Sequence, residues 1–535
     1  MPEYLSPGVY IEEFEIGARP IEGVGTSTLG FLGETERGPT EPRLITGWLN
    51  FQRIYGGYFE GNGNPYLPYS VEGFFANGGS RCYVARVVAR VDDESAAEKA
   101  SGKLVNETGV SFLTATAVGE GEWGNRIAFK VSEGTTNEES DDTLFRLTVY
   151  YLKTAIEGEL PTDEELDKAD IVEDFDDLSL DSSSDNFYEN KVNGISNLIV
   201  LTKEDNDTGE IPDFPTEEEV AAEEKEPIVI KGILKGGTNG VKADVTDYER
   251  GGAGTLEPGG RQGLLALNDV DEVAILYAPD AFSIDGLPNA LIGACEKLKD
   301  RFAILDAPKG ESNVDNLKPR NDYSTMYAAY YYPWIKVYDP LTKLYKTVPP
   351  GGHVAGIYAR SDIERGVHKA PANEKVKGVK DLEFNIGKGE QDILNPRGVN
   401  CIRAFSGRGI RVWGARTLSS NALWKYINVR RLFIFLEESI EKGTQWVVFE
   451  PNDEKLWARV KQTVNQFLTG VWKGGALMGS VPEEAFFIKC DRSTMTQDDI
   501  DNGRLIMIIG VAPVKPAEFV IFRIAQWQGG SAATE

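Results

Sequence analysis

Two histidines, His353 and His368, are the only side chains of the 535-residue sequence that could supply imidazole chemistry. A zinc site would need further cysteine or histidine ligands at short spacing. The four cysteines form no C-x-x-C pair and are Cys82, Cys295, Cys401 and Cys490. Their apolar or strand-like flanks favour buried free thiols over disulfides. Both histidines lie in a loop-rich stretch, so we expect them to be structural and expect no metal or cofactor.

One motif matches a nucleotide-binding loop by letters. Residues 119–124 read GEGEWG, which is G-x-G-x-x-G. Such a loop must open a helix whose N-terminal N–H groups hold a pyrophosphate. Here residues 125–131 alternate like a strand, and Glu120 and Glu122 would repel a phosphate, so we predict a turn between strands. G-x-S-x-G and G-x-x-x-x-G-K-[ST] are both absent from the sequence. The sequence therefore favours a protein that is not an enzyme.

Charge is distributed unevenly along the chain. Residues 155–226 hold 25 acidic and 4 basic residues, which accounts for −21 of the net charge of −28. Residues 393–436 hold no acidic residue and eight basic ones: Arg397, Arg403, Arg408, Arg411, Arg416, Lys425, Arg430 and Arg431. The acidic total disfavours nucleic acid as a partner. We expect arginines paired with carboxylates, because the planar guanidinium binds carboxylates bidentately.

The elements that would position these residues indicate several domains, as the chain length requires. Strands are expected at 28–32, 82–88, 273–277 and 302–305, and helices at 70–77 and 289–299. Strand–helix–strand units of this length usually form a parallel sheet. We therefore predict an α/β domain made of residues 24–90 and 240–360.

The remaining segments are expected to surround that domain. Residues 91–239 carry most of the acid and alternate apolar and polar residues, which predicts an inserted β-rich outer domain. Residues 361–514 predict a C-terminal α+β assembly domain, with apolar positions at helical spacing from 423 to 440 and from 456 to 471. Residues 1–23 are expected to be an extended N-terminal arm that pairs with the C-terminal domain, and residues 515–535 an extended C-terminal arm. The longest apolar run, 505–514, is about half the ~20 residues that a spanning helix needs, and the N-terminus has no visible secretion signal.

Several strings, in order, carry a family resemblance. They are YLSPGVYIEE at 4–13, PPGGHVAGIYAR at 349–360, KAPAN at 369–373, NPRGVN at 395–400, WGART at 413–417, YINVRR at 426–431, FEPND at 449–453 and APVKPAEF at 512–519. Together they resemble the contractile tail sheath proteins of phages and phage-tail-like injection systems. His368 stands where the family usually has an aromatic residue.

The resemblance implies a structural subunit that assembles as stacked hexameric rings around an inner tube and contracts without a nucleotide. The implied partners are other copies of the chain, the inner tube protein, and baseplate and terminal cap proteins, with no nucleic acid and no membrane insertion. The implied location is the bacterial cytoplasm during assembly and then a phage or phage-tail-like particle.

Open helical polymers need heterologous contacts, and extended arms can add strands to a neighbour's sheet edge. The residues expected to exchange between subunits are Val9, Tyr10, Ile11, Phe519, Val520, Ile521, Phe522, Arg523 and Ile524. The alternative is that both arms pair only within their own subunit. We also expect either the basic segment or the helix after Asn452 to face the tube, with Arg403, Arg408, Arg411, Arg416, Arg430 and Arg431 as candidates.

Three other functions remain open on the sequence. A type VI secretion sheath is normally split between two chains, whereas both end motifs occur here on one. A soluble α/β enzyme would show a pocket with a strongly perturbed carboxylate. A sheath relative that binds cells through its insert would be an adhesin. If the acidic insert lies on the outer surface, deleting residues 156–226 should spare assembly.

Overall fold

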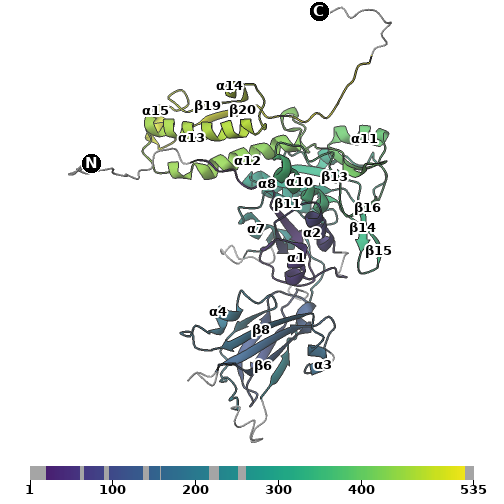
Figure 1. Ribbon diagram of the computed structural model, residues 1–535, viewed down its shortest axis with the longest axis vertical. Helices are drawn as coiled ribbons and strands as arrows, with labels where there is room; N and C mark the ends of the chain where they lie inside the picture. Colours follow the sequence, from purple (N-terminus) through teal and green to yellow (C-terminus); the bar gives the residue numbers. More distant parts are fainter. Residues whose placement is uncertain are drawn as a thin grey trace, which may run out of the picture. The chain divides into compact units, whose positions relative to one another are not determined.

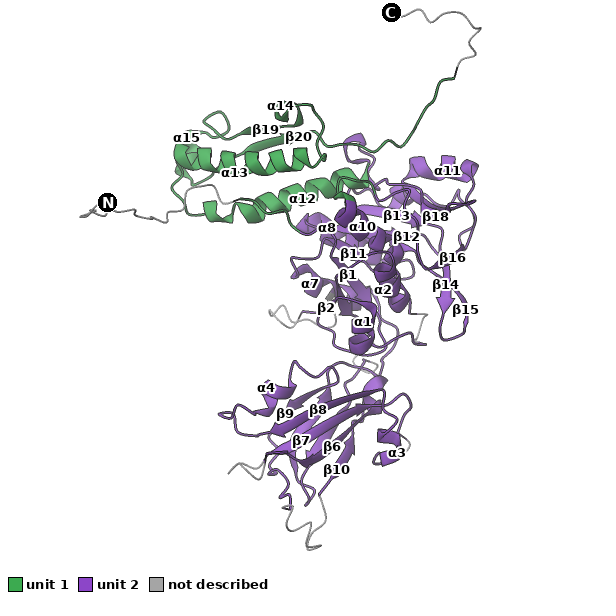
Figure 2. Ribbon diagram, in the orientation of Figure 1, with its two compact units in different colours: residues 1–24, 365–370, 426–535 green, residues 25–364, 371–425 purple. Residues whose placement is uncertain are grey.

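The computed structural model describes residues 20–60, 65–89, 96–136, 144–156, 158–215, 228–250 and 261–524. Val9, Tyr10 and Ile11 lie outside the described residues. Contacts divide the chain into two compact units (Figure 2). Unit 1 holds residues 1–24, 365–370 and 426–535, and unit 2 holds residues 25–364 and 371–425.

An eight-stranded sheet is the centre of unit 2, in the order β18-β17-β13-β12-β11-β1-β3-β2. Its strands are β1 (Leu29–Gly33), β2 (Arg43–Ile45), β3 (Cys82–Arg86), β11 (Ile275–Tyr277), β12 (Phe302–Asp306), β13 (Ala328–Tyr332), β17 (Val399–Phe405) and β18 (Gly409–Val412). The central pairs are parallel, and only β2 and β18 at the two edges run antiparallel. The central strands are short continuous apolar runs because a parallel sheet is covered on both faces. The predicted mixed α/β, multidomain fold is therefore confirmed.

Outside the inserted region, unit 2 also contains helices and short 3-10 turns, several of which pack on this sheet (Figure 1). They are α1 (Trp48–Tyr55), α2 (Leu67–Ala76), α6 (Val245–Arg250), α7 (Gly263–Asn268), α8 (Leu287–Leu298), α9 (Pro319–Asp322), α10 (Gly351–Arg365), α11 (Lys388–Leu394), η3 (Asn395–Arg397) and η4 (Ala422–Trp424). Helix α10 packs closely on α2: a Cβ added at Gly352 would lie 2.5 Å from the carbonyl oxygen of Ser70. The glycines of the PPGGHVAG string thus permit the helix contact.

The inserted region forms two antiparallel sheets that share one apolar core. One sheet has the order β10-β6-β7-β8 and the other β4-β5-β9. The elements are β4 (Ser101–Val105), β5 (Ser111–Ala117), η1 (Glu122–Arg126), β6 (Ile127–Glu133), β7 (Phe145–Tyr151), α3 (Asp163–Leu166), β8 (Ile171–Leu178), α4 (Tyr188–Val192), β9 (Ile199–Thr202) and β10 (Ile230–Ile233). The GEGEWG string connects β5 to β6 through η1, so the predicted turn between strands is confirmed.

A fourth sheet of unit 2, with three strands, has the order β15-β14-β16. Its strands are β14 (Ile335–Asp339), β15 (Leu344–Val348) and β16 (Val379–Leu382). Strands β14 and β15 form an antiparallel hairpin that pairs Ile335 with Val348 and Asp339 with Leu344. Strand β15 is therefore an edge strand of this sheet.

Unit 1 contains two long helices and a two-stranded sheet. Its elements are α12 (Ile427–Gly443), η5 (Gln445–Val447), α13 (Glu454–Lys473), α14 (Pro482–Ala485), β19 (Phe486–Lys489), α15 (Gln497–Asp501) and β20 (Ile508–Val511). Asp453 is the N-cap of helix α13, and its carboxylate accepts a hydrogen bond from the N–H of Leu456 at 2.8 Å. One apolar face of α13 packs in the core of the unit through Leu456, Val460, Val464 and Leu468.

Two expectations from the sequence, about a domain boundary and about His353, need correction. The boundary expected at residue 361 does not follow the contacts, because β17 and β18 complete the edge of the main sheet of unit 2. His353 lies in helix α10 and not in a loop, and burial lowers its pKa to about 4. All four cysteines are buried and free, as predicted.

Candidate assembly surfaces

The described part of the C-terminal arm is extended and exposed. Phe519, Val520, Ile521, Phe522 and Ile524 are 69, 68, 79, 83 and 94% exposed. No strand pairs with residues 519–524 within the described residues, which the sequence predicted to be part of an extended arm. A run of large apolar side chains in this state is typical of a segment that is covered only in an assembly.

In unit 1, the residues from which the two arms extend contact opposite ends of α12. The N–H of Val24 donates to Oγ of Ser439 at 3.1 Å, and Ile21 packs against Gly443. At the other end, Nδ2 of Asn428 donates to the carbonyl of Val514 at 3.2 Å. A helix rises about 1.5 Å per residue, so the contacts at Asn428 and Ser439 lie roughly 16 Å apart along α12. Both arms therefore leave from fixed points on one helix.

The β19–β20 sheet offers edges to which such arms could pair. It has two strands, with Phe486 opposite Val511 and Lys489 opposite Ile508. Within the described residues β19 and β20 pair with no other strand, whereas residues 512–514, directly after β20, hydrogen bond to residues 476–478. Phe487 and Ile508 are 51 and 47% exposed. Unpaired edges with exposed apolar side chains readily accept another strand.

Three of the arginines proposed as tube-facing are instead buried. Arg416, Arg430 and Arg431 are 7, 2 and 3% exposed. Nη1 of Arg416 donates to the carbonyl of Asn395 at 3.0 Å, and Nη2 of Arg430 donates to Glu437 at 2.6 Å. The proposal that these three side chains face a partner is therefore wrong, because their guanidinium groups lie inside the fold.

The other three arginines lie on the β17–β18 hairpin and are partly or fully exposed. Arg403 donates to the carbonyl of Ile386 at 2.9 Å, and Arg411 donates to the carbonyl of Asn373 at 2.7 Å. The guanidinium of Arg408 lies 5.6 Å from the ring centre of Trp413. They are held in place by the surrounding loops and remain candidates for a contact with another protein.

The solvent-exposed face of α13 is a second basic surface, outside the basic segment of residues 393–436. Lys455, Arg459, Lys461 and Lys473 are exposed on this helix, whereas Glu454 is its only acidic residue. Arg459 forms an ion pair with Glu450 at 3.2 Å. No ion pair is formed by Lys455, Lys461 or Lys473 within the described residues. The helix therefore presents unneutralised positive charge to solvent.

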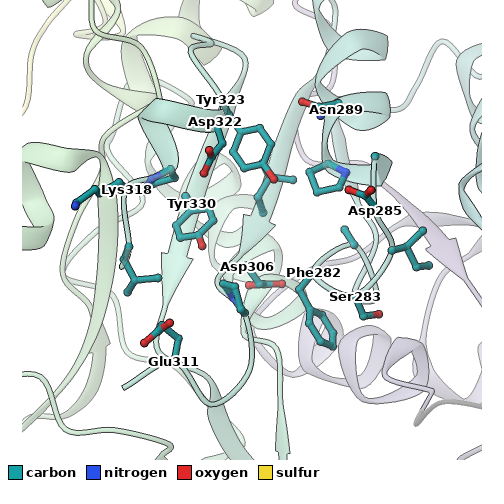
Figure 3. A pocket seen from close by; sticks show the side chains of 18 of the residues that line it. Phe282, Ser283, Asp285, Asn289, Asp306, Glu311, Lys318, Asp322, Tyr323 and Tyr330 are labelled. Atoms are coloured by element: carbon teal, nitrogen blue, oxygen red, sulfur yellow. The ribbon is translucent and has the colours of Figure 1, made fainter. Parts of the chain in front are cut away.

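A cavity of about 400 Å³ lies beyond the carboxyl ends of β11 and β12, and Figure 3 shows its lining. Four carboxylates line it, from Asp285, Asp306, Glu311 and Asp322, against the single cation of Lys318. The lining includes no histidine and no cysteine. Its one serine, Ser283, donates to the carbonyl of Asp280 and has no base beside it. The strongly perturbed carboxylate that the enzyme alternative requires is, however, present in this lining as Asp306.

Desolvation raises the pKa of Asp306 to about 7, and a hydrogen bond from Tyr277 opposes this only partly. The folded chain therefore binds a proton that the unfolded chain releases between about pH 4 and 7, so this group lowers stability as pH rises. A pKa difference between 3.8 and about 7 corresponds to roughly 4 kcal/mol.

Asp306→Asn should show a smaller loss of Tm than the wild type between pH 5 and pH 8. The exposed Asp271→Asn is the control, and an equal slope for Asp306→Asn would contradict this account.

The deletion of residues 156–226 considered from the sequence would damage the inserted domain. It would remove β8 and β9, which contribute Leu178, Ile199 and Leu201 to the core.

The two ends of the insert meet at residues 98 and 238, where the N–H of Glu98 donates to the carbonyl of Thr238 at 3.0 Å. Replacing residues 99–237 by a short Gly-Ser linker should leave the rest of unit 2 folded and competent to assemble, since the linker spans a short gap. Electron microscopy would check this, and absence of polymers from a folded variant would show that the insert is needed.

Comparison with known proteins identifies the family of the chain. Residues 262–418 match the model of the phage tail sheath protein central domain, and residues 419–526 match that of the phage tail sheath C-terminal domain. A tail sheath protein of Vibrio phage KVP40 is 28% identical over 40% of this chain and 31% of that protein. A putative prophage major tail sheath protein of Pseudomonas aeruginosa (strain UCBPP-PA14) is 26% identical over 54% of this chain and 76% of that protein. The chain belongs to the tail sheath family, and it spans about a third of the length of the Vibrio phage relative.

Solved structures share the fold. The sheath of the extracellular contractile injection system PVC in its contracted state matches with a TM-score of 0.58 and 23% identity, covering 98% of this chain and 99% of that chain. A sheath tail protein of Listeria innocua matches with a TM-score of 0.57 and 12% identity, covering 92% and 96%. Among the described residues, none of the helices is both long and apolar enough to cross a membrane.

Proposed function

We propose that the chain is the sheath subunit of a contractile particle, polymerising around an inner tube and contracting to drive that tube through a target envelope. The observation that carries the proposal is the exposed apolar C-terminal arm, which leaves a unit whose own two-stranded sheet has unpaired edges. A heterologous contact of this kind propagates along a helical polymer. The subunits would form stacked hexameric rings in the bacterial cytoplasm and then be part of the released particle.

In the proposed polymer, Phe519–Ile524 of one copy adds a strand to the β19–β20 sheet of a neighbour. Strand addition uses main-chain hydrogen bonds for affinity and alternate side chains for specificity. The arms tether neighbouring copies while the folded units change their packing, so the lattice can shorten without dissociating. The chain would need no nucleotide and no enzymatic step, because the free energy of contraction is stored in the extended lattice.

The proposed tube contact uses the exposed face of α13, with Lys455, Lys461 and Lys473 meeting an acidic surface of the tube protein. Baseplate and terminal cap proteins would contact the same arms and edges at the two ends of the polymer. A chain in the structure of the anti-feeding prophage baseplate has this fold, with a TM-score of 0.53, 23% identity, and coverage of 98% of this chain and 99% of that chain. That similarity supports a baseplate as a partner of this chain.

Hydrogen exchange tests the strand addition directly. The backbone amides of residues 519–524 have no partner in the single chain within the described residues, so they should exchange at near the unprotected rate in the monomer. In the polymer, alternate amides should be slowed at least about a hundredfold, because they would be bound in a ladder. Equal exchange in monomer and polymer would exclude strand addition by this arm.

A further inference from the structure

The acidic pocket of unit 2 is built to receive a positive charge. Asp285 and Asp322 are exposed at its rim, and neither forms an ion pair within the described residues. Phe282, Tyr323 and Tyr330 also line it, and Figure 3 shows their rings among the carboxylates. Carboxylates beside aromatic faces favour a cationic group with an apolar stem.

One oxygen in this pocket has no hydrogen-bond partner. Oδ2 of Asp306 accepts from the hydroxyl of Tyr277 at 2.6 Å, but its buried Oδ1 accepts from no group in the described residues. Burying a polar oxygen without a partner is costly. A donor that enters the pocket from outside would remove this cost.

The tip of the β14–β15 hairpin carries a group of that kind. Lys343 is exposed there and forms no ion pair within the described residues. Leu341 and Leu344 beside it are 46 and 68% exposed, and Tyr345 is 57% exposed. A cation flanked by exposed apolar side chains on an edge hairpin is typical of a docking surface.

This tip is also held in one conformation before any contact is made. The N–H of Lys343 donates to the carbonyl of Asp339 at 2.8 Å. The carboxylate of Asp339 accepts from the N–H of Leu341 at 3.0 Å and from the hydroxyl of Thr342 at 2.8 Å. A preformed tip loses little conformational entropy on binding.

We propose that the β14–β15 hairpin of one copy docks its Lys343 tip into the acidic pocket of a second copy. The two surfaces are complementary in charge, with one unpaired cation against four carboxylates and one lysine. They are different patches on one molecule, so their contact is heterologous and extends an open helical array. The inference rests on the proposed function and gives the lattice a contact between folded bodies in addition to its arms.

Charge exchange in the full chain tests the contact. Lys343→Glu should raise the critical concentration for polymerisation at least about tenfold, because it places a carboxylate among carboxylates. Lys343→Glu combined with Asp322→Lys should recover most of that loss. Lys297→Glu, an equal charge change on an exposed position of α8, is the matched control and should assemble like the wild type.

Zero-length carbodiimide cross-linking of polymers made from mixed isotope-labelled and unlabelled copies provides a second measurement. The expected product joins Lys343 of one copy to Asp285 or Asp322 of another. Normal assembly of Lys343→Glu, or cross-links from Lys343 only to other sites, would overturn the docking while leaving the sheath function intact. Saturable binding of spermidine to the pocket in polymers of normal stability would likewise overturn it in favour of a small amine. Failure of the wild type to polymerise would instead remove the proposed function itself.

Discussion

Truncation of the chain after Glu518 should abolish polymerisation and leave a folded monomer. The removed segment includes the five apolar side chains of residues 519–524, which are mostly exposed in the single chain and contribute little to its stability. Burying each such side chain in a neighbour is worth about 1.5–3 kcal/mol. Loss of only two of them should weaken association at least about a hundredfold.

Sedimentation velocity and circular dichroism together measure this prediction. The truncated chain should sediment as a monomer at concentrations where the full chain forms polymers, with a Tm within about 2 °C of the full chain. A shorter truncation that removes only residues 525–535 is the control and should polymerise. Polymers of normal stability from the chain ending at Glu518 would show that this arm does not hold the copies together.

Arg430→Glu should unfold unit 1, which is the second large effect. Arg430 is 2% exposed, and its guanidinium donates to Glu437 at 2.6 Å and lies 5.8 Å from the ring centre of Phe433. The variant would bury an unpaired carboxylate next to Glu437. Glu437 is half exposed, so the loss comes from burying the new carboxylate without a partner, which costs several kcal/mol of the roughly 5–15 kcal/mol that stabilises a domain.

Limited proteolysis and thermal unfolding distinguish this loss of folding from loss of a binding surface. Arg430→Glu should be cleaved rapidly within residues 426–511 and should lack the native thermal transition of unit 1. Lys455→Glu with Lys461→Glu on the exposed face of α13 is the comparison: it should keep the wild-type Tm and lose assembly on tubes. A stable Arg430→Glu monomer that fails only to bind tubes would restore the original interpretation of this arginine.

The parallel sheet and the helices were predictable because their signals are local. The apolar runs of β1, β11 and β12 and the spacing of Leu456, Val460 and Val464 predict element types directly. Sheet membership depends on long-range pairing, which no local pattern reports. The residues of β17 and β18 were therefore assigned to the C-terminal domain. In the structure Tyr330 of β13 pairs with Val399 of β17, so they belong to the main sheet of unit 2.

The interface residues were harder to predict because a residue count gives no side-chain direction. Arg416 and Arg430 belong to a basic segment, but both are buried and donate inside the fold, Arg416 to the carbonyl of Asn395 and Arg430 to Glu437. The basic face of α13 lies in a mixed sequence and emerges only when its residues are placed on a helix. His353 was expected in a loop-rich stretch, whereas the glycines beside it allow α10 to approach α2 closely and the residue is helical.

Negative-stain electron microscopy of the purified full chain, alone and with its tube protein, tests the central claim most directly. We expect hollow, striated cylinders with six-fold end views, whose diameter and pitch distinguish an extended from a contracted lattice. A uniform monomer under both conditions would contradict the sheath function.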